Sequence, residues 1–207
     1  MTDGRHPSAL HERLVFLKRF LKNPRQVGAL APSSRVLAHE MLRHVSLTPE
    51  SHVVELGPGT GVFTREIISR LPAGAKFLAV DIDPHFCDTL RARWPSLDCE
   101  CGSAEHLPAI IAARGWTDVD SIVSGLPFAS LPTALSRAIL SAIQATLRPG
   151  GEFTTFQYVH AYPTPAAAAF RREMTARFGP MSDRRFVGGN IPPAFVLSWR
   201  QPARERS

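Results

Sequence analysis

Hydrophobic and polar positions follow two alternating patterns along most of this chain. Short apolar runs that suit buried strands occur at residues 52–56, 77–81, 97–101, 121–124 and 152–157. Stretches with helical spacing separate these runs, at residues 63–71, 84–93, 106–114 and 133–147. Because a helix that joins two parallel strands forms a right-handed crossover, this alternation predicts a doubly wound α/β sheet.

The C-terminal part of the chain predicts one further helix and two further strands. The helix is expected over residues 164–178, and the strands around Phe186 and over residues 194–199. Such a pair of strands can close a mostly parallel sheet with an antiparallel edge. The predicted fold is therefore a Rossmann-like, mostly parallel, seven-stranded sheet in one domain over residues 49–207.

Residues 1–48 predict a helical extension in front of that domain. Residues 10–22 place leucine and phenylalanine on one helical face and lysine on the opposite face. Asn23-Pro24 ends this helix, and Ser33 or Ser34 can cap a second one that runs to about His44. A basic amphipathic helix with bulky aromatic residues is typical of a membrane interface, and the pattern equally fits a helix packed on its own domain.

Charge is concentrated at the two ends of the chain. The 24 Lys and Arg exceed the 18 Asp and Glu, which gives a formal net charge of +6. Residues 10–35 hold six basic residues and one acidic residue, and residues 171–207 hold eight and three. Basic ends favour a polyanionic partner, either nucleic acid or an anionic membrane surface, although they can also serve solubility alone.

Several protein classes do not fit this sequence. No apolar run approaches the roughly 18 residues of a transmembrane helix, and the N-terminus lacks the apolar core of a secretory signal. The three cysteines, Cys87, Cys99 and Cys101, provide neither a disulfide framework nor a four-ligand zinc set. We therefore expect a cytoplasmic protein without a bound metal.

The strongest chemical motif follows the first predicted strand, where Glu55 to Gly61 read Glu-Leu-Gly-Pro-Gly-Thr-Gly. Glycines at a strand-to-helix turn let a ligand approach the backbone closely. The spacing differs from the G-x-G-x-x-G fingerprint of dinucleotide sites, and Glu55 would repel a pyrophosphate but attract an ammonium or sulfonium group. The motif resembles that of class I S-adenosylmethionine-dependent methyltransferases.

This resemblance implies S-adenosylmethionine as the cofactor. Asp81 stands 24 residues after Gly57, close to the spacing expected for an acid that binds the ribose hydroxyls. Asp83 is the alternative ribose ligand, although we expect it to cap the helix that follows. Ser103 stands where the family usually has an aspartate at the adenine amino group, so Ser103 or Glu105 would make that contact. The expected cofactor-binding residues are Ser33, Ser34, Glu55, Gly57, Gly59, Thr60, Gly61, Asp81, Ile82, Ser103, Ala104, Ser124, Gly125 and Leu126.

The expected acceptor site lies at the end of the fourth strand. Residues 124–128 read Ser-Gly-Leu-Pro-Phe and resemble the Asn-Leu-Pro-Tyr or Asn-Pro-Pro-Tyr segment of amino-group methyltransferases. Gly125 takes the place of the asparagine, whose side chain holds the flat exocyclic amine of a nucleobase. Phe128 could still stack on an acceptor. A flexible primary amine beside backbone carbonyls therefore suits the site better than a base.

Three segments together resemble bacterial phospholipid N-methyltransferases: residues 16–38, with motifs at 23–25 and 27–34, residues 124–127 and residues 189–196. That family methylates phosphatidylethanolamine stepwise toward phosphatidylcholine as a peripheral membrane enzyme. The resemblance implies a role in phospholipid biosynthesis at the inner face of the cytoplasmic membrane. It implies phosphatidylethanolamine and an anionic membrane surface as partners, no nucleic acid, and a monomer. It also implies that Ser33 and Ser34 lie over the cofactor.

Tyr158 and His160 are the candidate catalytic residues. The family's Gln-Phe-Thr-Tyr segment appears here as residues 157–160, with Tyr162 nearby. By analogy with lysine, a lipid amine has a pKa of about 10, so it must lose a proton before it can attack. His160 has the best-matched ordinary pKa for accepting that proton, and transfer to water without a dedicated base is the alternative.

The main alternative function is that of an RNA methyltransferase similar to the rRNA adenine dimethyltransferases, which share the fold and would also explain the basic ends. Gly125 argues against it, as does the absence of an RNA-binding domain after residue 170. A non-catalytic membrane-binding protein with a vestigial crevice is disfavoured by the intact glycines and acids. A methyltransferase for a small soluble amine or quinone-like acceptor would leave the amphipathic helix without a role.

Overall fold

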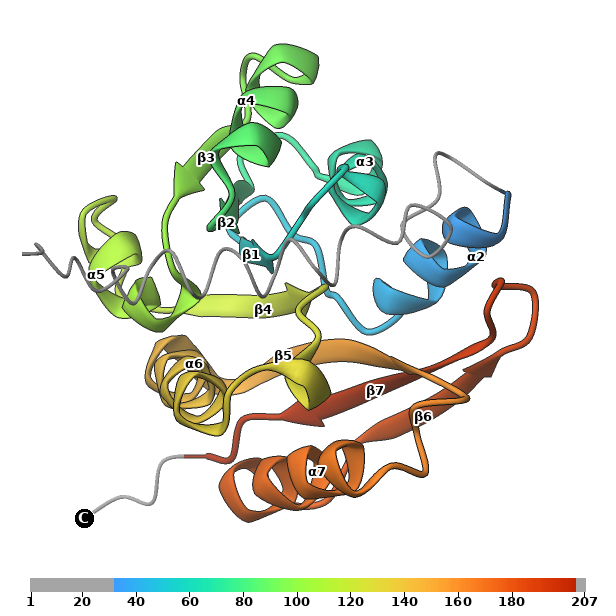
Figure 1. Cartoon of the computed structure of the whole chain (residues 1–207). Helices are drawn as coiled ribbons and strands as arrows, with labels where there is room; N and C mark the ends of the chain where they lie inside the picture. Colours follow the sequence, from blue (N-terminus) through green and yellow to red (C-terminus); the bar gives the residue numbers. More distant parts are fainter. Residues whose placement is uncertain (1–31, 204–207) are drawn as a thin grey trace, which may run out of the picture.

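One seven-stranded sheet organises the protein, in the order β3-β2-β1-β4-β5-β7-β6 (Figure 1). The computed structural model describes residues 32–203, with side chains from residue 35. β7 pairs antiparallel with β5 and β6, whereas the pairs among β1 to β5 are parallel. The strands are β1 (His52–Leu56), β2 (Lys76–Asp81), β3 (Asp98–Cys101), β4 (Val119–Ser124), β5 (Leu147–Tyr158), β6 (Asp183–Val187) and β7 (Ala194–Arg200). The predicted Rossmann-like fold is confirmed.

Helices cover both faces of the sheet and bury its strands. On one face lie α2 (Pro32–Met41), α3 (Val62–Arg70) and α4 (Pro84–Arg93); on the other lie α5 (Leu107–Ala112), α6 (Thr133–Thr146) and α7 (Pro165–Phe178). Short 3₁₀ turns, η1 (Ala104–His106) and η2 (Phe128–Ser130), follow β3 and β4. The central strands are apolar on both sides because both of their faces are covered.

The helix starts follow ordinary capping chemistry. Asp83 caps α4 as predicted, since its carboxylate accepts a hydrogen bond from the His85 N–H at 3.0 Å and Pro84 occupies the first helical position. The prediction that Ser33 or Ser34 caps the second helix is wrong. α2 already begins at Pro32, whose fixed φ suits a first helical position, so both serines lie in its first turn.

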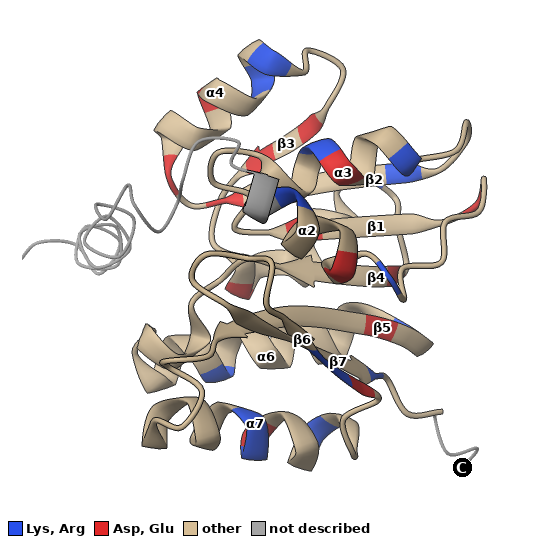
Figure 2. Ribbon diagram, turned by 90° about the vertical axis from the view of Figure 1, so that its right-hand side faces the viewer, with Lys and Arg blue, Asp and Glu red and all other residues tan. Residues whose placement is uncertain are grey.

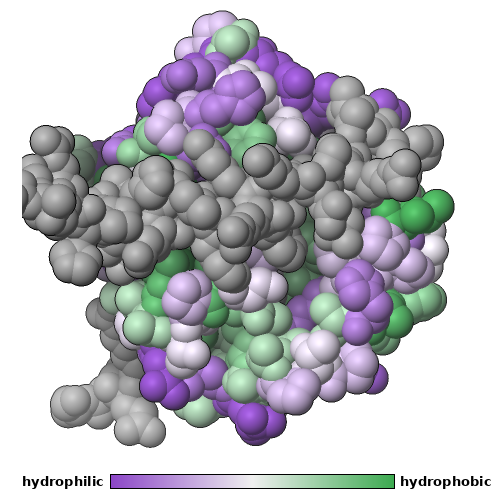
Figure 3. Space-filling model, viewed as in Figure 1, coloured by the Kyte–Doolittle hydropathy of each residue, from purple (hydrophilic) through white to green (hydrophobic). Residues whose placement is uncertain are grey.

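Charged and hydrophobic residues are distributed unevenly over the described part of the molecule (Figures 2 and 3). Lys and Arg are prominent on the outer faces of α4 and α7 (Figure 2). Hydrophilic residues cover the region of α4, and hydrophobic residues gather along the right-hand edge of the view in Figure 3, where α2 and the end of the β6–β7 hairpin lie. None of the helices within residues 32–203 combines the length and the apolarity needed to cross a bilayer.

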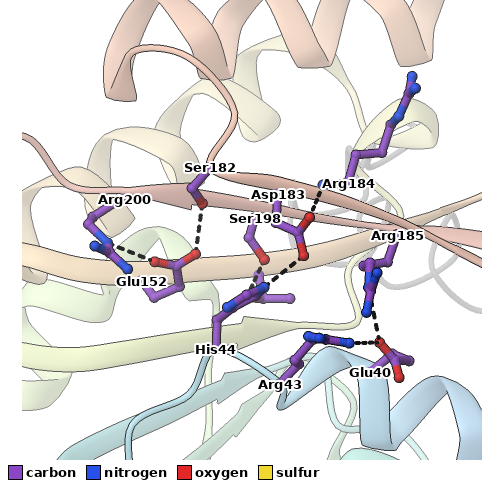
Figure 4. Close-up of polar contacts among 11 residues, drawn as sticks. Glu40, Arg43, His44, Glu152, Ser182, Asp183, Arg184, Arg185, Ser198 and Arg200 are labelled. Carbon is purple, nitrogen blue, oxygen red and sulfur yellow. Dashed lines mark hydrogen bonds and ion pairs between the residues drawn. The ribbon is translucent and has the colours of Figure 1, made fainter.

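Polar contacts fasten α2 and the turn after it to the edge strand β6 (Figure 4). His44 Nε2 lies 2.7 Å from Asp183 Oδ2, and this contact is the main reason why the pKa of Asp183 is lowered. Glu40 pairs with Arg43 on its own side and with Arg185 of β6 at 3.7 Å. α2 is thereby held at the sheet, while the predicted amphipathic helix over residues 10–22 lies outside the described residues. The predicted division at residue 48 stays a prediction.

The aromatic core on the α6–α7 face yields a stability prediction. Phe153 of β5 is fully buried, and its ring contacts those of Phe128, Phe178 and Trp199. We expect Phe153→Ala to lower the free energy of unfolding by about 3–5 kcal/mol, because it leaves a cavity that these neighbours cannot fill. Urea denaturation measures the loss. Phe186→Ala is the matched control, since Phe186 is 63% exposed; equal losses would contradict this description of the core.

Candidate active site

A cleft opens at the carboxyl ends of β1, β2 and β4. β1 and β4 are neighbours in the sheet, but the chain continues from β1 to one face of the sheet and from β4 to the other. In doubly wound folds, ligands bind at the point where two neighbouring strands diverge in this way. The cleft is lined by Gly57, Val80, Asp81, Ile82, Gly102, Ser103, Ala104, Leu126, Leu131, Leu135 and Ile139. Apolar walls with a few convergent polar groups are typical of a site for a small organic ligand.

Close packing explains two of the three glycines in the loop after β1. Gly57 has φ +69°, and a Cβ there would lie 2.7 Å from a Leu126 methyl carbon. Gly61 has φ +81°, and a Cβ there would lie 2.6 Å from the Trp94 ring. Both positions combine a left-handed backbone with a contact that only glycine allows. Thr60 lies between them, and its carbonyl accepts a hydrogen bond from Arg93.

Gly59 differs from its two neighbours because it faces open space. Its φ is +53°, but a Cβ at this position would meet no atom of the described residues within 4 Å. No packing contact within the described residues therefore requires glycine at this position; only its left-handed backbone does, and the space above it is free. A ligand that approaches the backbone of the loop can use that space.

Glu55 is a fully buried carboxyl group beneath this loop. Thr64 donates a hydrogen bond to Glu55 Oε2 at 2.6 Å, while Oε1 has no hydrogen-bond partner among the described residues. Burial raises the pKa of Glu55 to about 8, and the nearby Asp81 adds to the rise. An unsatisfied buried oxygen is costly, so the carboxyl group is suited to a positively charged or hydrogen-bonding partner that arrives with a ligand.

Asp81 lines the cleft at the end of β2, where it also holds the glycine loop. Its Oδ2 accepts a hydrogen bond from the Gly59 N–H at 3.0 Å, and its Oδ1 accepts one from the Asp83 N–H at 2.9 Å. Burial raises the pKa of Asp81, and these two donors oppose the rise. A carboxylate offers about four acceptor positions, so two remain for hydroxyl groups of a ligand.

The far end of the cleft is mainly apolar. Ser103 and Ala104 line it, and the Ser103 hydroxyl donates to Glu105 Oε1 at 3.1 Å, so the two residues proposed at the adenine contact are linked. Ile82 forms another part of the wall. The sequence prediction did not include the three walls contributed after β4: Leu131, Leu135 and Ile139. The only signal in the sequence was the four-residue spacing of Leu135 and Ile139, which places both on one face of α6.

At the end of β4, backbone packing leaves little room for a side chain. A Cβ at Gly125 would lie 2.7 Å from the Gly57 carbonyl oxygen. The buried Ser124 hydroxyl accepts from the Leu126 N–H at 3.3 Å, and Leu126 lines the cleft. The expectation that Phe128 could stack on an acceptor is wrong, because Phe128 is buried and stacks on Phe170 at 4.8 Å.

The two candidate catalytic residues lie outside the lining of the cleft. Tyr158 ends β5, and its ring stacks on that of His160 at 5.6 Å. Burial raises the pKa of Tyr158, so its phenol is protonated at neutral pH. Tyr162 faces the opposite side of the sheet, where Arg171 lies 3.8 Å over its ring. Ser33 and Ser34 belong to α2, and their side chains lie outside the described part.

Comparisons with known proteins identify the family. Residues 53–151 match a family model described as a methyltransferase domain. The chain is 32% identical to an ornithine lipid N-methyltransferase of Singulisphaera acidiphila over 186 residues, which cover 87% of this chain and 91% of that protein. The chain belongs to the class I S-adenosylmethionine-dependent methyltransferases. The cofactor of this methyltransferase is therefore S-adenosylmethionine, as the sequence predicts.

Other proteins similar to this methyltransferase have lower sequence identity or match a shorter part of the chain. A 1,6-didemethyltoxoflavin-N1-methyltransferase of Burkholderia thailandensis, solved with S-adenosylhomocysteine, has a TM-score of 0.68 at 20% identity and covers 97% of this chain and 93% of its own. This likeness shows the fold. A ribosomal RNA small subunit methyltransferase A of Thermotoga petrophila is 34% identical over 79 residues, but these cover 38% of this chain and 29% of that protein.

The residues of the cleft fit the cofactor. Among the lining residues, Asp81 has acceptor positions for the ribose, and the apolar walls suit the flat adenine ring. Glu55 is buried and does not line the cleft, but its unsatisfied oxygen suits the cationic methionine end. When bound, S-adenosylmethionine supplies a methyl group on a sulfonium. The open space at Gly59 is the place where it can approach the loop.

This last inference gives a binding prediction with a matched control. We expect Gly59→Ala to weaken binding of S-adenosylhomocysteine at least about tenfold, because the added methyl group occupies the space that the ligand needs. Gly115→Ala is the control, since Gly115 has φ +72° and a Cβ added there would also meet no described atom within 4 Å. Both variants should lose similar stability, about 1–2 kcal/mol from the left-handed backbone. Calorimetry that finds equal affinities would contradict the placement.

The buried Glu55 gives a pH prediction. The folded protein keeps this carboxyl group protonated up to about pH 8, whereas an unfolded glutamate releases its proton near pH 4.5. The folded state therefore binds more protons in this window, and its free energy of unfolding falls as pH rises. We expect a fall on the order of 4 kcal/mol from Glu55 alone. Urea denaturation at pH 5 and pH 8 should show a smaller fall in Glu55→Gln, and identical falls would contradict the assignment.

Proposed function

We propose that this methyltransferase methylates the primary amine of a membrane-lipid head group at an anionic membrane surface, as a monomer and without a metal. Two lipids present the required chemistry. Phosphatidylethanolamine, methylated stepwise toward phosphatidylcholine, is implied by the sequence resemblance, and ornithine lipid by the relative from Singulisphaera acidiphila. Both carry a flexible primary amine beside an anionic group.

The packing of Gly125 is the observation that carries the proposal. A side chain at this position would collide with the Gly57 carbonyl, so the asparagine that holds a nucleobase amine in base methyltransferases has no room. Phe128 is turned into the core and offers no ring to a base. Backbone carbonyls remain to accept hydrogen bonds, and these suit an ammonium or amine.

The lengths of the matches also favour a lipid acceptor over RNA. The lipid N-methyltransferase aligns over 91% of its length, whereas the rRNA methyltransferase of Thermotoga petrophila aligns over 29%. The segment that this chain shares with the RNA enzyme is therefore less than a third of that protein. RNA methylation remains the alternative that the experiment below includes.

The chemistry requires a neutral amine. Removal of water from the head group and the nearby sulfonium both favour loss of the amine proton. Tyr158 is protonated at neutral pH, so it suits the role of a hydrogen-bond donor rather than a base. His160, stacked on it, is the proposed proton acceptor, and direct transfer to water is the alternative.

A lipid acceptor also requires the protein to work at the membrane. Exposing an acyl chain to water costs about 0.8 kcal/mol for each CH₂ group, so the enzyme must bind at the bilayer. The basic amphipathic pattern of residues 10–22 supports such attachment. We place the protein at the inner face of the cytoplasmic membrane on this argument.

Transfer of a labelled methyl group tests the proposal. The full chain is incubated with deuteromethyl S-adenosylmethionine and phosphatidylglycerol vesicles that contain either phosphatidylethanolamine or ornithine lipid, and a parallel arm contains 16S rRNA. We expect mass spectrometry to find methylated head groups with one or both lipids and unlabelled RNA. Asp81→Asn is the negative control, because it removes the carboxylate that accepts from the Gly59 N–H and that we expect to bind the ribose. Label in RNA and none in either lipid would overturn the proposal.

A further inference from the structure

The few exposed hydrophobic side chains of the described residues are gathered at one place. Only three large hydrophobic residues of that part are exposed: Val36 at 44%, Phe186 at 63% and Ile191 at 81%. Val36 of α2 lies against the turn of the β6–β7 hairpin, within 3.7 Å of where a Cβ of Gly189 would stand. Exposed apolar residues are ordinary when scattered singly, whereas a cluster marks a surface that contacts something else.

The cluster lies on both faces of the hairpin end. Phe186 contacts the Phe195 ring on the α7 face of the sheet, while its neighbours Arg185 and Val187 point to the α2 face, where Val36 also lies. Ile191 lies in the turn between the two strands. A partner surface lying flat against one face would leave the other exposed, so only end-on insertion of the hairpin buries all three side chains.

The hairpin end lies on the side of the sheet where the parallel strands end, which is also the side of the active-site cleft. β7 runs antiparallel to β5, so the start of β7 pairs with the end of β5, Ala194 opposite Tyr158. The Val159 N–H donates to the Pro193 carbonyl at 2.9 Å, which joins the hairpin to the segment between Tyr158 and His160. A surface that receives the hairpin end is therefore brought next to the candidate catalytic residues.

The charges around the cluster suit an anionic lipid surface. Residues 186–193 carry no charge and appear tan in Figure 2, and no Asp or Glu occurs between Arg184 and Arg200. Arg35, Arg184 and Arg185 are exposed beside the cluster, and of these Arg185 also pairs with Glu40 of α2. Apolar residues at a tip with arginines behind them match the layers of a bilayer, acyl chains inside and phosphates outside.

We propose that residues 186–193 of the β6–β7 hairpin, together with Val36, form a membrane-docking tip that inserts end-on into the interface of an anionic bilayer. The tip sets the orientation of the protein, so that the end of β5 and the mouth of the cleft lie at the level of the lipid head groups. This inference deepens the proposed lipid methylation and adds a site of attachment within the fold to that expected from residues 10–22.

A probe at the tip tests insertion directly. In the full chain with Cys101→Ser, the only exposed cysteine of the described residues is removed, and Ile191→Cys is labelled with an environment-sensitive dye. We expect a blue shift with phosphatidylglycerol vesicles and none with phosphatidylcholine vesicles. The control carries the dye at Lys76→Cys, an exposed position at the start of β2 on the opposite edge of the sheet, and should not respond. No shift at position 191, or a shift only from self-association in light scattering, would overturn the proposal.

A variant pair separates this inference from the proposed function. We expect Phe186→Ser/Ile191→Ser to weaken binding to phosphatidylglycerol vesicles about tenfold or more, and Phe186→Leu/Ile191→Leu to retain it, because apolar burial drives insertion. Affinity for S-adenosylhomocysteine should be unchanged in both. Lipid methylation with wild-type vesicle binding in the serine variant would refute the tip and leave the function standing. Lost vesicle binding in that variant, with no lipid methylated by the wild type, would refute the function and leave the tip.

Discussion

The close approach between the ends of β1 and β4 is the constraint on which the site depends. The backbones of Gly57 and Gly125 lie so near that a Cβ on Gly125 would stand 2.7 Å from the Gly57 carbonyl oxygen, and a Cβ on Gly57 would stand 2.7 Å from a Leu126 methyl carbon. This contact fixes the loop whose Gly59 N–H is bonded to Asp81. The same contact excludes a large side chain at the acceptor position, so one packing requirement shapes both halves of the cleft.

Two buried carboxyl groups give that cleft its electrostatic character. Burial raises the pKa of both Glu55 and Asp81, and each lies beneath or beside the glycine loop. Burying a carboxyl group costs stability when one of its oxygens has no hydrogen-bond partner, as is the case for Glu55 Oε1 among the described residues. S-adenosylmethionine carries a cation and a pair of hydroxyl groups, and these fit the acceptor positions that the protein leaves open.

The sheet topology gathers the cleft, the end of β5 and the β6–β7 hairpin at one edge. The antiparallel β7 is what places a turn, rather than another strand end, beside Tyr158. The contacts of His44 with Asp183 and of Glu40 with Arg185 hold α2 at the same edge. An enzyme whose acceptor stays in a membrane needs its site and its attachment on one side, and the proposed docking tip would meet that requirement.

The sequence by itself determined the strand and helix order, the glycine loop and the acids at Glu55 and Asp81, because periodicity and short-range spacing encode local structure. The tertiary structure alone decided that Phe128 faces the core and that Leu135 and Ile139 wall the cleft, because both depend on which distant elements pack together. It also decided that Val36, Phe186 and Ile191 meet at one tip. Val36 comes from α2, far from the hairpin in the sequence, and no local pattern records its proximity to Phe186 and Ile191.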